Sequence, residues 1–245
     1  MKALSKAEQG VSIAEMSVVI VIIALLASVI SGGISLRQSA EICSFLLNIN
    51  DFQVAIEGFN YKYTALPGDM PNAFSYWDDG TGTVCGTDNQ CNGNGDGHID
   101  LSGSSTPNES FRAWQHLVLS GYMEGLSFTG VGGGTGQEAD IGINVPAAKR
   151  SKVGYMILYA NSSGSNRNEI QVGSFAVNQP ATNSALTASE AYLIDKKIDD
   201  ANPSTGKIIG FSGNDATSNC RSADGNSYQL DASGAICRMS FPLSM

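Results

Sequence analysis

The sequence predicts an α+β fold with a long N-terminal transmembrane/stalk helix that carries a glycine-rich α+β head with an antiparallel sheet. Three observations predict it. An apolar run extends from Val11 to Ile30, an amphipathic pattern continues to Tyr63, and short β-like segments follow in a chain with 28 glycines among 245 residues. We therefore expect a leader over 1–10, the helix over 11–65 and the head over 66–245.

The first part of the predicted helix, residues 11–31, has about the 20 residues that cross a bilayer. Glu15 is the carboxylate within it, and a charge at that depth costs about 2.5 to 3.5 kcal/mol. An ordinary secretory signal peptide does not account for this residue. Cleavage after Gly10 would give Val11 a new α-ammonium group four residues before Glu15, which predicts a charge pair within one helix or between neighbouring helices.

The residues around this glutamate resemble a known leader. The run Gly10-Val11-Ser12-Ile13-Ala14-Glu15, followed by Met16-Ser17-Val18-Val19-Ile20, is similar to the class III leader and helix of type IV pilins and type II secretion pseudopilins. The resemblance implies a pilin-like head, cleavage after Gly10 by a prepilin peptidase, and N-methylation of Val11. It also implies that Glu15 faces the N-terminal amine of an adjacent subunit during filament assembly. The sequence departs from the family at Val11, where phenylalanine is usual.

The resemblance favours a non-enzymatic subunit of a type II secretion pseudopilus or a type IV pilus. The resemblance implies that the chain first lies in the bacterial inner membrane, which it crosses once with its C-terminal head in the periplasm. After assembly it would lie in the pseudopilus or the cell-surface pilus. The implied partners are the prepilin peptidase, like or related pilin subunits and the inner membrane. The alternative is a membrane-anchored or secreted calcium-stabilised binding or adhesive domain that does not polymerise.

Composition excludes other function classes. The formal net charge is −9 and the sequence pI is about 4.6, which argues against a nucleic-acid partner, because phosphate binding needs clustered cations. The chief basic cluster is Lys149, Arg150 and Lys152. No Ser/His/Asp or Cys/His set indicates an enzyme.

The second half of the predicted helix carries one apolar stripe. Its members recur at three- and four-residue steps: Ile42, Phe45, Leu46, Ile49, Phe52, Ile56, Phe59 and Tyr63. The run Leu66-Pro67-Gly68-Asp69 then predicts the end of the helix. In the head we expect a helix from about Thr106 to Gly121, a β-hairpin of 152–160 with 169–177, a helix over 187–200 and a strand over 207–211.

The five cysteines fit an exported head. Cys85 and Cys91 bracket a small loop, while Cys220 and Cys237 bracket a longer one that resembles the disulfide-closed loop of many type IV pilins. We expect both pairs to form disulfides, which would place the head outside the cytoplasm. Cys43 belongs to neither of these two pairs, and we expect it either to be a small buried apolar residue or to form a disulfide bridge between subunits.

An asparagine- and glycine-rich loop suggests calcium as a cofactor. With Gly97 at a sharp turn, the tentative ligands have the alternate spacing of an EF-hand-type loop: Asn92, Asn94, Asp96, the carbonyl of His98, and Asp100. The bidentate glutamate of such loops is missing, because Gly103 stands at its position. The loop is therefore interpreted either as a weak calcium site or as a turn closed by the neighbouring disulfide without an ion.

Overall fold

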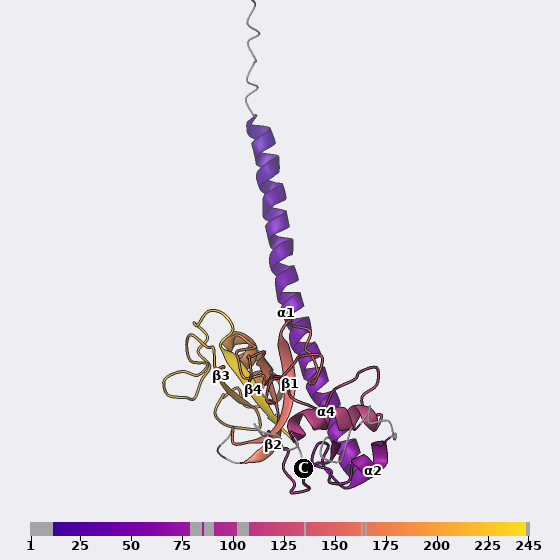
Figure 1. Cartoon of the computed structure of the whole chain (residues 1–245). Coiled ribbons are helices and arrows are strands. Elements are labelled where there is room, and N and C mark those ends of the chain that lie inside the picture. The colour runs from indigo at the N-terminus through magenta and orange to yellow at the C-terminus, as the bar shows by residue number, and fades with distance from the viewer. Residues whose placement is uncertain are drawn as a thin grey trace, which may run out of the picture. The chain divides into compact units, whose positions relative to one another are not determined.

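Helix α1 runs without interruption from Ile13 to Tyr63, as the sequence predicted (Figure 1). The chain divides inside this helix into two compact units, Met1–Cys43 and Ser44–Met245. The computed structural model describes residues 12–78, 85, 91–101, 108–134, 136–162, 164 and 166–243, without the side chains of 29–32 and 34–35. Each unit is therefore described by itself.

The predicted transmembrane assignment of this helix is wrong. Among the described residues, no helix combines the length and the apolar character that a bilayer crossing requires. This finding overturns two predictions, which are the transmembrane/stalk part of the fold class and the single-pass location in the inner membrane.

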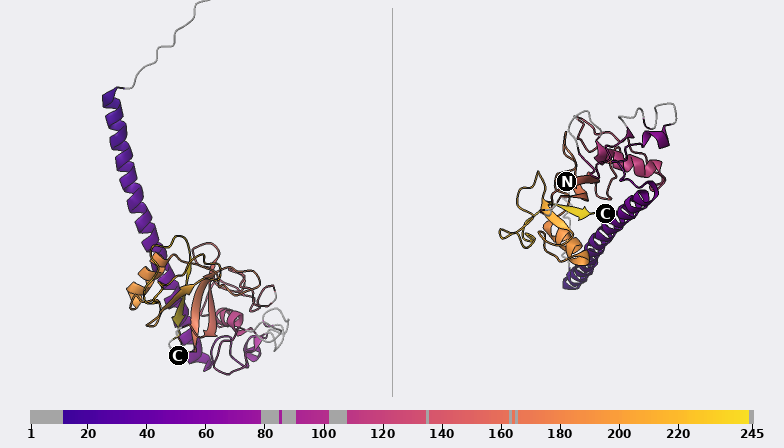
Figure 2. Two further views of the ribbon diagram at one scale, coloured as in Figure 1. Left: turned by 90° about the vertical axis from the view of Figure 1, so that its left-hand side faces the viewer. Right: turned by 90° about the horizontal axis from the view of Figure 1, so that it is seen from below.

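The unit Ser44–Met245 has the expected α+β composition. Its described helices after α1 are α2 (Phe74–Trp77), α4 (Glu109–Leu119) and α5 (Ala188–Ile198), and its described strands are β1 (Val153–Ala160), β2 (Arg167–Ser174), β3 (Ile209–Ser212) and β4 (Cys237–Pro242). Helix α4 contacts β1 and helix α5 contacts β4 (Figure 2).

The strands form one antiparallel sheet in the order β1-β2-β4-β3. The predicted hairpin is confirmed as β1 and β2, with Val153 opposite Ser174 and Ala160 opposite Arg167. The predicted strand over 207–211 corresponds to β3. Strand β4 was not predicted, and it inserts between β2 and β3.

The core lies where the second half of α1 meets the sheet and α4. Phe52 packs edge-on against Trp114 of α4 and Tyr155 of β1, with ring centroids 4.9 and 5.0 Å away. Phe45 lies 5.7 Å from the ring of Phe241 on β4. These aromatic pairs use the stripe that the sequence predicted, and they join the helix to the sheet.

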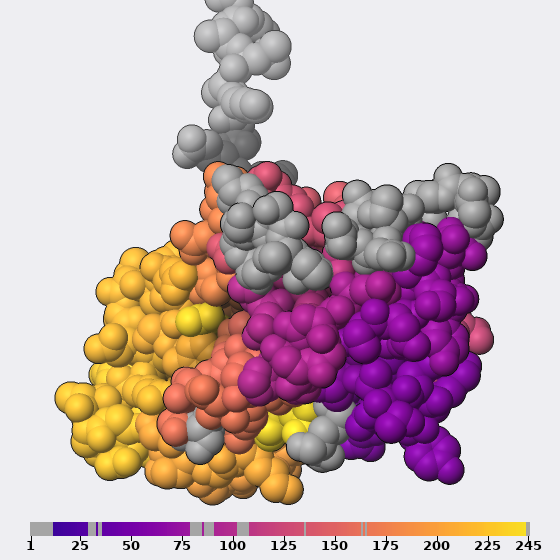
Figure 3. All heavy atoms as spheres, turned by 60° about the horizontal axis from the view of Figure 1, so that its bottom comes forward, coloured from indigo at the N-terminus to yellow at the C-terminus, as the bar shows by residue number. Residues whose placement is uncertain are grey.

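Both predicted disulfides are present. Cys85 bonds to Cys91 and Cys220 bonds to Cys237, each with 5.0 Å between the Cα atoms. Cys43 is exposed on α1, so the prediction that it is a buried hydrophobe is wrong. In Figure 3 the purple N-terminal segments of the unit Ser44–Met245 and its yellow C-terminal segments occupy opposite sides of one face.

Candidate functional site

The structure describes one of the three residues that were predicted for cleavage, methylation and assembly. Gly10 and Val11 lie outside the described residues, whereas Glu15 lies exposed in the first turn of α1. Its Oε2 accepts a hydrogen bond of 2.8 Å from the Ser12 N–H, and the Ser12 Oγ accepts one of 3.2 Å from the Glu15 N–H. This reciprocal pair is a capping box that satisfies two backbone donors at the helix start.

Sequence reasoning missed this local role of Glu15. The spacing Ser12-x-x-Glu15 is the signature of a capping box and could have revealed it. The hydrogen bond from the Ser12 N–H, with a second one from the Ser12 side chain, lowers the pKa of Glu15. The carboxylate therefore stays ionised at neutral pH, in a form that can accept an ammonium partner.

The helix around and beyond Glu15 is apolar on all sides. Ten large apolar side chains there are each at least 49% exposed, and they are Ile13, Met16, Val18, Val19, Ile20, Val21, Ile22, Ile23, Leu25 and Leu26. Consecutive residues point in different directions around a helix, so apolar side chains are exposed to solvent on every face of this segment. An exposed apolar surface of this extent marks a place where another molecule binds.

The loop of the predicted calcium ligands folds around carboxylates of the chain itself. Asp69 is 4% exposed, and its Oδ1 accepts hydrogen bonds from the Gly95 and Asp96 N–H groups at 2.6 and 3.1 Å. Its Oδ2 accepts one of 2.9 Å from the Gly97 N–H. Three successive backbone donors thus form a nest for an anion. Gly97 has φ +87°, which confirms the predicted sharp turn.

Glu109, the first residue of α4, holds the same loop from its other side. Its side chain is buried, and its two oxygens accept hydrogen bonds from the Asn94 and Asp100 N–H groups at 2.8 and 2.9 Å. Burial raises the pKa of Glu109 to about 7, and the nearby charges of Asp69 and Asp100 act in the same direction. Burial also raises the pKa of Asp69.

His116 on α4 fixes two neighbouring segments. Its Nδ1 accepts a hydrogen bond of 2.9 Å from the Gly68 N–H, so Nε2 carries the proton and donates to the Cys91 carbonyl oxygen, also at 2.9 Å. The ring is completely buried, and burial lowers its pKa to about 4. A neutral histidine with both nitrogens occupied is a structural residue.

This geometry gives the predicted calcium site no support. Asn92 Oδ1 accepts the Phe74 N–H at 2.8 Å, and the Asp96 oxygens accept from the His98 N–H and the Asn94 amide at 2.8 and 3.0 Å. Asp96, His98 and Asp100 are also not among the described groups whose ligand atoms converge within 4.8 Å. Asn94 Oδ1 also accepts the Asp96 N–H at 2.9 Å, so three of the expected ligands bond within the protein.

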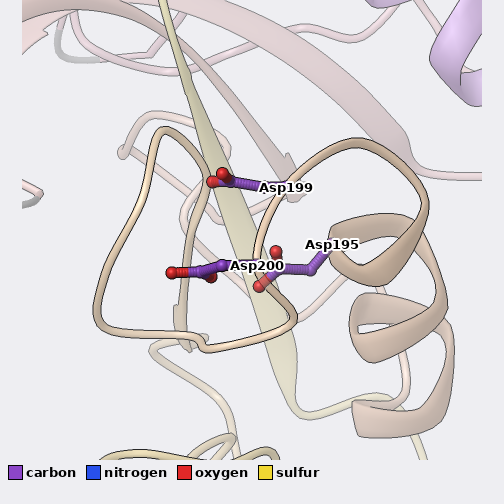
Figure 4. A group of neighbouring side chains, drawn as sticks. All are labelled: Asp195, Asp199 and Asp200. Carbon is purple, nitrogen blue, oxygen red and sulfur yellow. The ribbon is translucent and has the colours of Figure 1, made fainter.

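One described group of acidic side chains does converge, at the end of α5. Figure 4 shows Asp195 on the last turn of the helix, with Asp199 and Asp200 on the segment that follows. Asp195 accepts from the Tyr228 hydroxyl at 2.7 Å, Asp199 from the Ile208 N–H at 2.7 Å, and Asp200 from the Thr205 hydroxyl at 2.6 Å. These bonds join the helix end to its neighbours.

Comparison with known proteins gives no matching family model, no matching curated protein and no matching solved structure. The candidate functional site therefore rests on the chain's own features. The strongest is the apolar segment Ile13–Leu26, defined by its exposed side chains, with Glu15 in its first turn.

Proposed function

We propose that the chain is a prepilin-like filament subunit. In this proposal a prepilin peptidase cleaves after Gly10, Val11 becomes N-methylated, and the mature helix assembles with like or related subunits into a type II secretion pseudopilus or a type IV pilus. The resemblance of residues 10–20 to the class III leader motivates the assignment.

The observation that carries the proposal is the exposed segment Ile13–Leu26. Large apolar side chains surround the helix there, and such a helix gains free energy when other apolar surfaces cover it, at roughly 25 cal/mol per Å² removed from water. The same segment of other copies supplies a matching surface. Bundling of these helices is therefore the proposed assembly step.

Glu15 supplies register in this bundle. A carboxylate among apolar helices is stable when an ammonium group neutralises it, and the new amine of Val11 in a neighbouring copy is such a group. One pair of the Glu15 carboxylate and the Val11 amine in each contact between helices fixes how far each helix is displaced along the next. The capping box with Ser12 orients the carboxylate before assembly.

Glu15→Gln tests this role, because glutamine can still accept the Ser12 N–H but carries no charge. An unpaired buried ammonium costs about 3 to 5 kcal/mol, so we expect filament recovery below about one-tenth of wild type. The full chain is co-expressed with a prepilin peptidase, and filaments are sheared, pelleted and quantified. Intact mass verifies the loss of residues 1–10 and the addition of one methyl group.

Ser12→Ala is the matched control, since it removes the hydroxyl half of the capping box and keeps the carboxylate. We expect Ser12→Ala filaments at close to wild-type recovery. Normal filaments from Glu15→Gln, or an equal loss in both variants, would show that the charge has no special part in assembly. An unprocessed wild-type chain would contradict the cleavage step.

A further inference from the structure

A ridge of exposed apolar side chains lies on the part of α1 that belongs to the unit Ser44–Met245. Leu47, Val54 and Tyr61 are 62%, 59% and 93% exposed. Because seven residues make almost two helical turns, these three side chains follow one line along the helix. The core residue Phe45 stands two positions before Leu47, roughly opposite on the helix, so the ridge faces away from the core.

Carboxylates flank this ridge on both sides. Asp51 and Glu57 are exposed, and at about 100° per residue they project on opposite sides of the line through Val54. The nearby Lys62 Nζ lies 5.0 Å from the ring centroid of Tyr63. Two such ridges placed face to face would bring like charges together, which disfavours a contact between identical ridges.

A second surface of the same unit has the complementary character. An open cavity of about 450 Å³ is lined by apolar residues that include Ile141, Ile143 and Phe175, and by Lys152. Ile143 is 57% exposed at its edge. The cavity therefore offers apolar walls to an inserted side chain and a cation beside them.

The cationic margin of the cavity is the turn that the sequence marked as the chief basic cluster. Lys149 and Lys152 are exposed, whereas Arg150 pairs with Glu190 at 3.0 Å. Lys152 has φ +61°, a conformation uncommon for a residue with a side chain, and its carbonyl oxygen accepts the Phe175 N–H at 2.9 Å. That bond fixes the turn beside the apolar wall. Asp140 also lines the cavity and offsets Lys152, so the net positive charge of this margin comes from Lys149, whose chain neighbours Ala148 and Arg150 line the cavity.

We propose that the ridge of one copy docks in the cavity of a second copy, with Asp51 and Glu57 beside Lys149 and Lys152. The two surfaces share no residue, so the contact is heterologous and can repeat along an open helical filament. Complementary charge then holds together subunits that are all acidic. This inference rests on the proposed function and adds a contact between heads to the contact between N-terminal helices.

Cysteine crosslinking tests the docking in filaments of the full chain. In a Cys43→Ser background, Val54→Cys is combined with Ile143→Cys and treated with a short bismaleimide. We expect a ladder of crosslinked multimers from the double variant and only monomer from each single variant. The matched control pairs Ile143→Cys with Leu193→Cys, which lies on α5 and is 40% exposed. Equal ladders from this control, or dimers from Val54→Cys alone, would overturn the docking.

Charge reversal is an independent test of the same contact. Glu57→Lys and Lys152→Glu should each lower the crosslinking yield about threefold or more, and their combination should restore it. Filaments that form normally without the predicted crosslink would overturn this docking and leave the proposed function standing. If neither the wild-type chain nor the Cys43→Ser chain forms filaments with a prepilin peptidase present, the proposed function fails and the docking fails with it.

Discussion

Two buried carboxylates make the stability of the head depend on pH. Burial raises the pKa of Glu109 from 4.5 to about 7 and the pKa of Asp195 from 3.8 to about 6. A raised pKa means that the folded chain binds the proton more tightly than the unfolded chain. The stabilising effect of protonation is therefore fully present below the unfolded pKa and is lost as the pH rises through the folded pKa.

For Glu109 this window extends from about pH 4.5 to about pH 7. We expect the free energy of unfolding of wild type to fall by about 2 to 3 kcal/mol relative to Glu109→Gln across it. Urea unfolding at several pH values measures this difference. Glutamine cannot accept hydrogen bonds through both of its terminal atoms, so Glu109→Gln is less stable than wild type at low pH. The test is therefore how the difference in free energy of unfolding between the two chains changes with pH.

Glu124→Gln is the control for the removal of an exposed carboxylate, and it gives the baseline with which the slope of Glu109→Gln is compared. Carboxylates with a lowered pKa, such as Glu190, lose their contribution at more acidic pH. The titration of Asp195 falls in the same window, but it is common to both chains and cancels in the difference. A difference between wild type and Glu109→Gln that stays constant from pH 4.5 to 7 would contradict the assigned burial effect.

At the scale of elements, the second disulfide closes the segment that leads into β4. Cys237 is the first residue of β4, and its N–H donates to the Leu186 carbonyl oxygen at 2.9 Å. Cys220→Ser combined with Cys237→Ser should lower the free energy of unfolding by about 3 kcal/mol, as for a loop of this length. Thermal unfolding followed by circular dichroism measures the loss.

Cys43→Ser is the control for this prediction, because Cys43 lies outside both disulfides. We expect it to change stability by less than about 0.5 kcal/mol, as for most exposed positions. A double variant as stable as Cys43→Ser would show that the bond contributes little to holding β4 in the sheet.

Local patterns predicted the elements that local chemistry determines. Helix α1, the β1–β2 hairpin and α5 have clear periodicity or turn residues. Strand β4 has no such pattern: it is six residues long, ends in Pro242, and pairs with residues far away in sequence, such as Ile170 opposite Phe241. Its place depends on tertiary pairing, which one sequence does not reveal.

The conformation of the loop over 92–100 depends on tertiary contacts in the same way. Its spacing of oxygen-bearing residues resembles a calcium loop, but its geometry depends on Asp69 and Glu109, which lie outside the loop in sequence. A carboxylate that approaches from elsewhere in the fold can hold the loop that an ion would otherwise organise. By contrast, the capping box of Ser12 and Glu15 is local and could have been predicted from the sequence.

At the scale of the whole molecule, the chain combines a head that has a buried apolar core with a helix whose apolar side chains are exposed to solvent. The head is closed by two disulfides and an antiparallel sheet. The segment Ile13–Leu26 exposes large apolar side chains on every side. In the proposed function, assembly of the helix displays the folded head, and the net charge of −9 disfavours association of the heads before assembly.

The most direct test of assembly through the helix is the fraction of chain recovered as sedimented filaments, compared between wild type and Ile20→Asp. A second carboxylate in the apolar bundle, with no amine to neutralise it, costs several kcal/mol. We predict filaments from wild type, less than about one-tenth of that recovery from Ile20→Asp, and an unchanged near-ultraviolet circular dichroism spectrum of the head. Equal filament recovery from both chains, or a wild-type chain that stays monomeric after processing, would contradict the account.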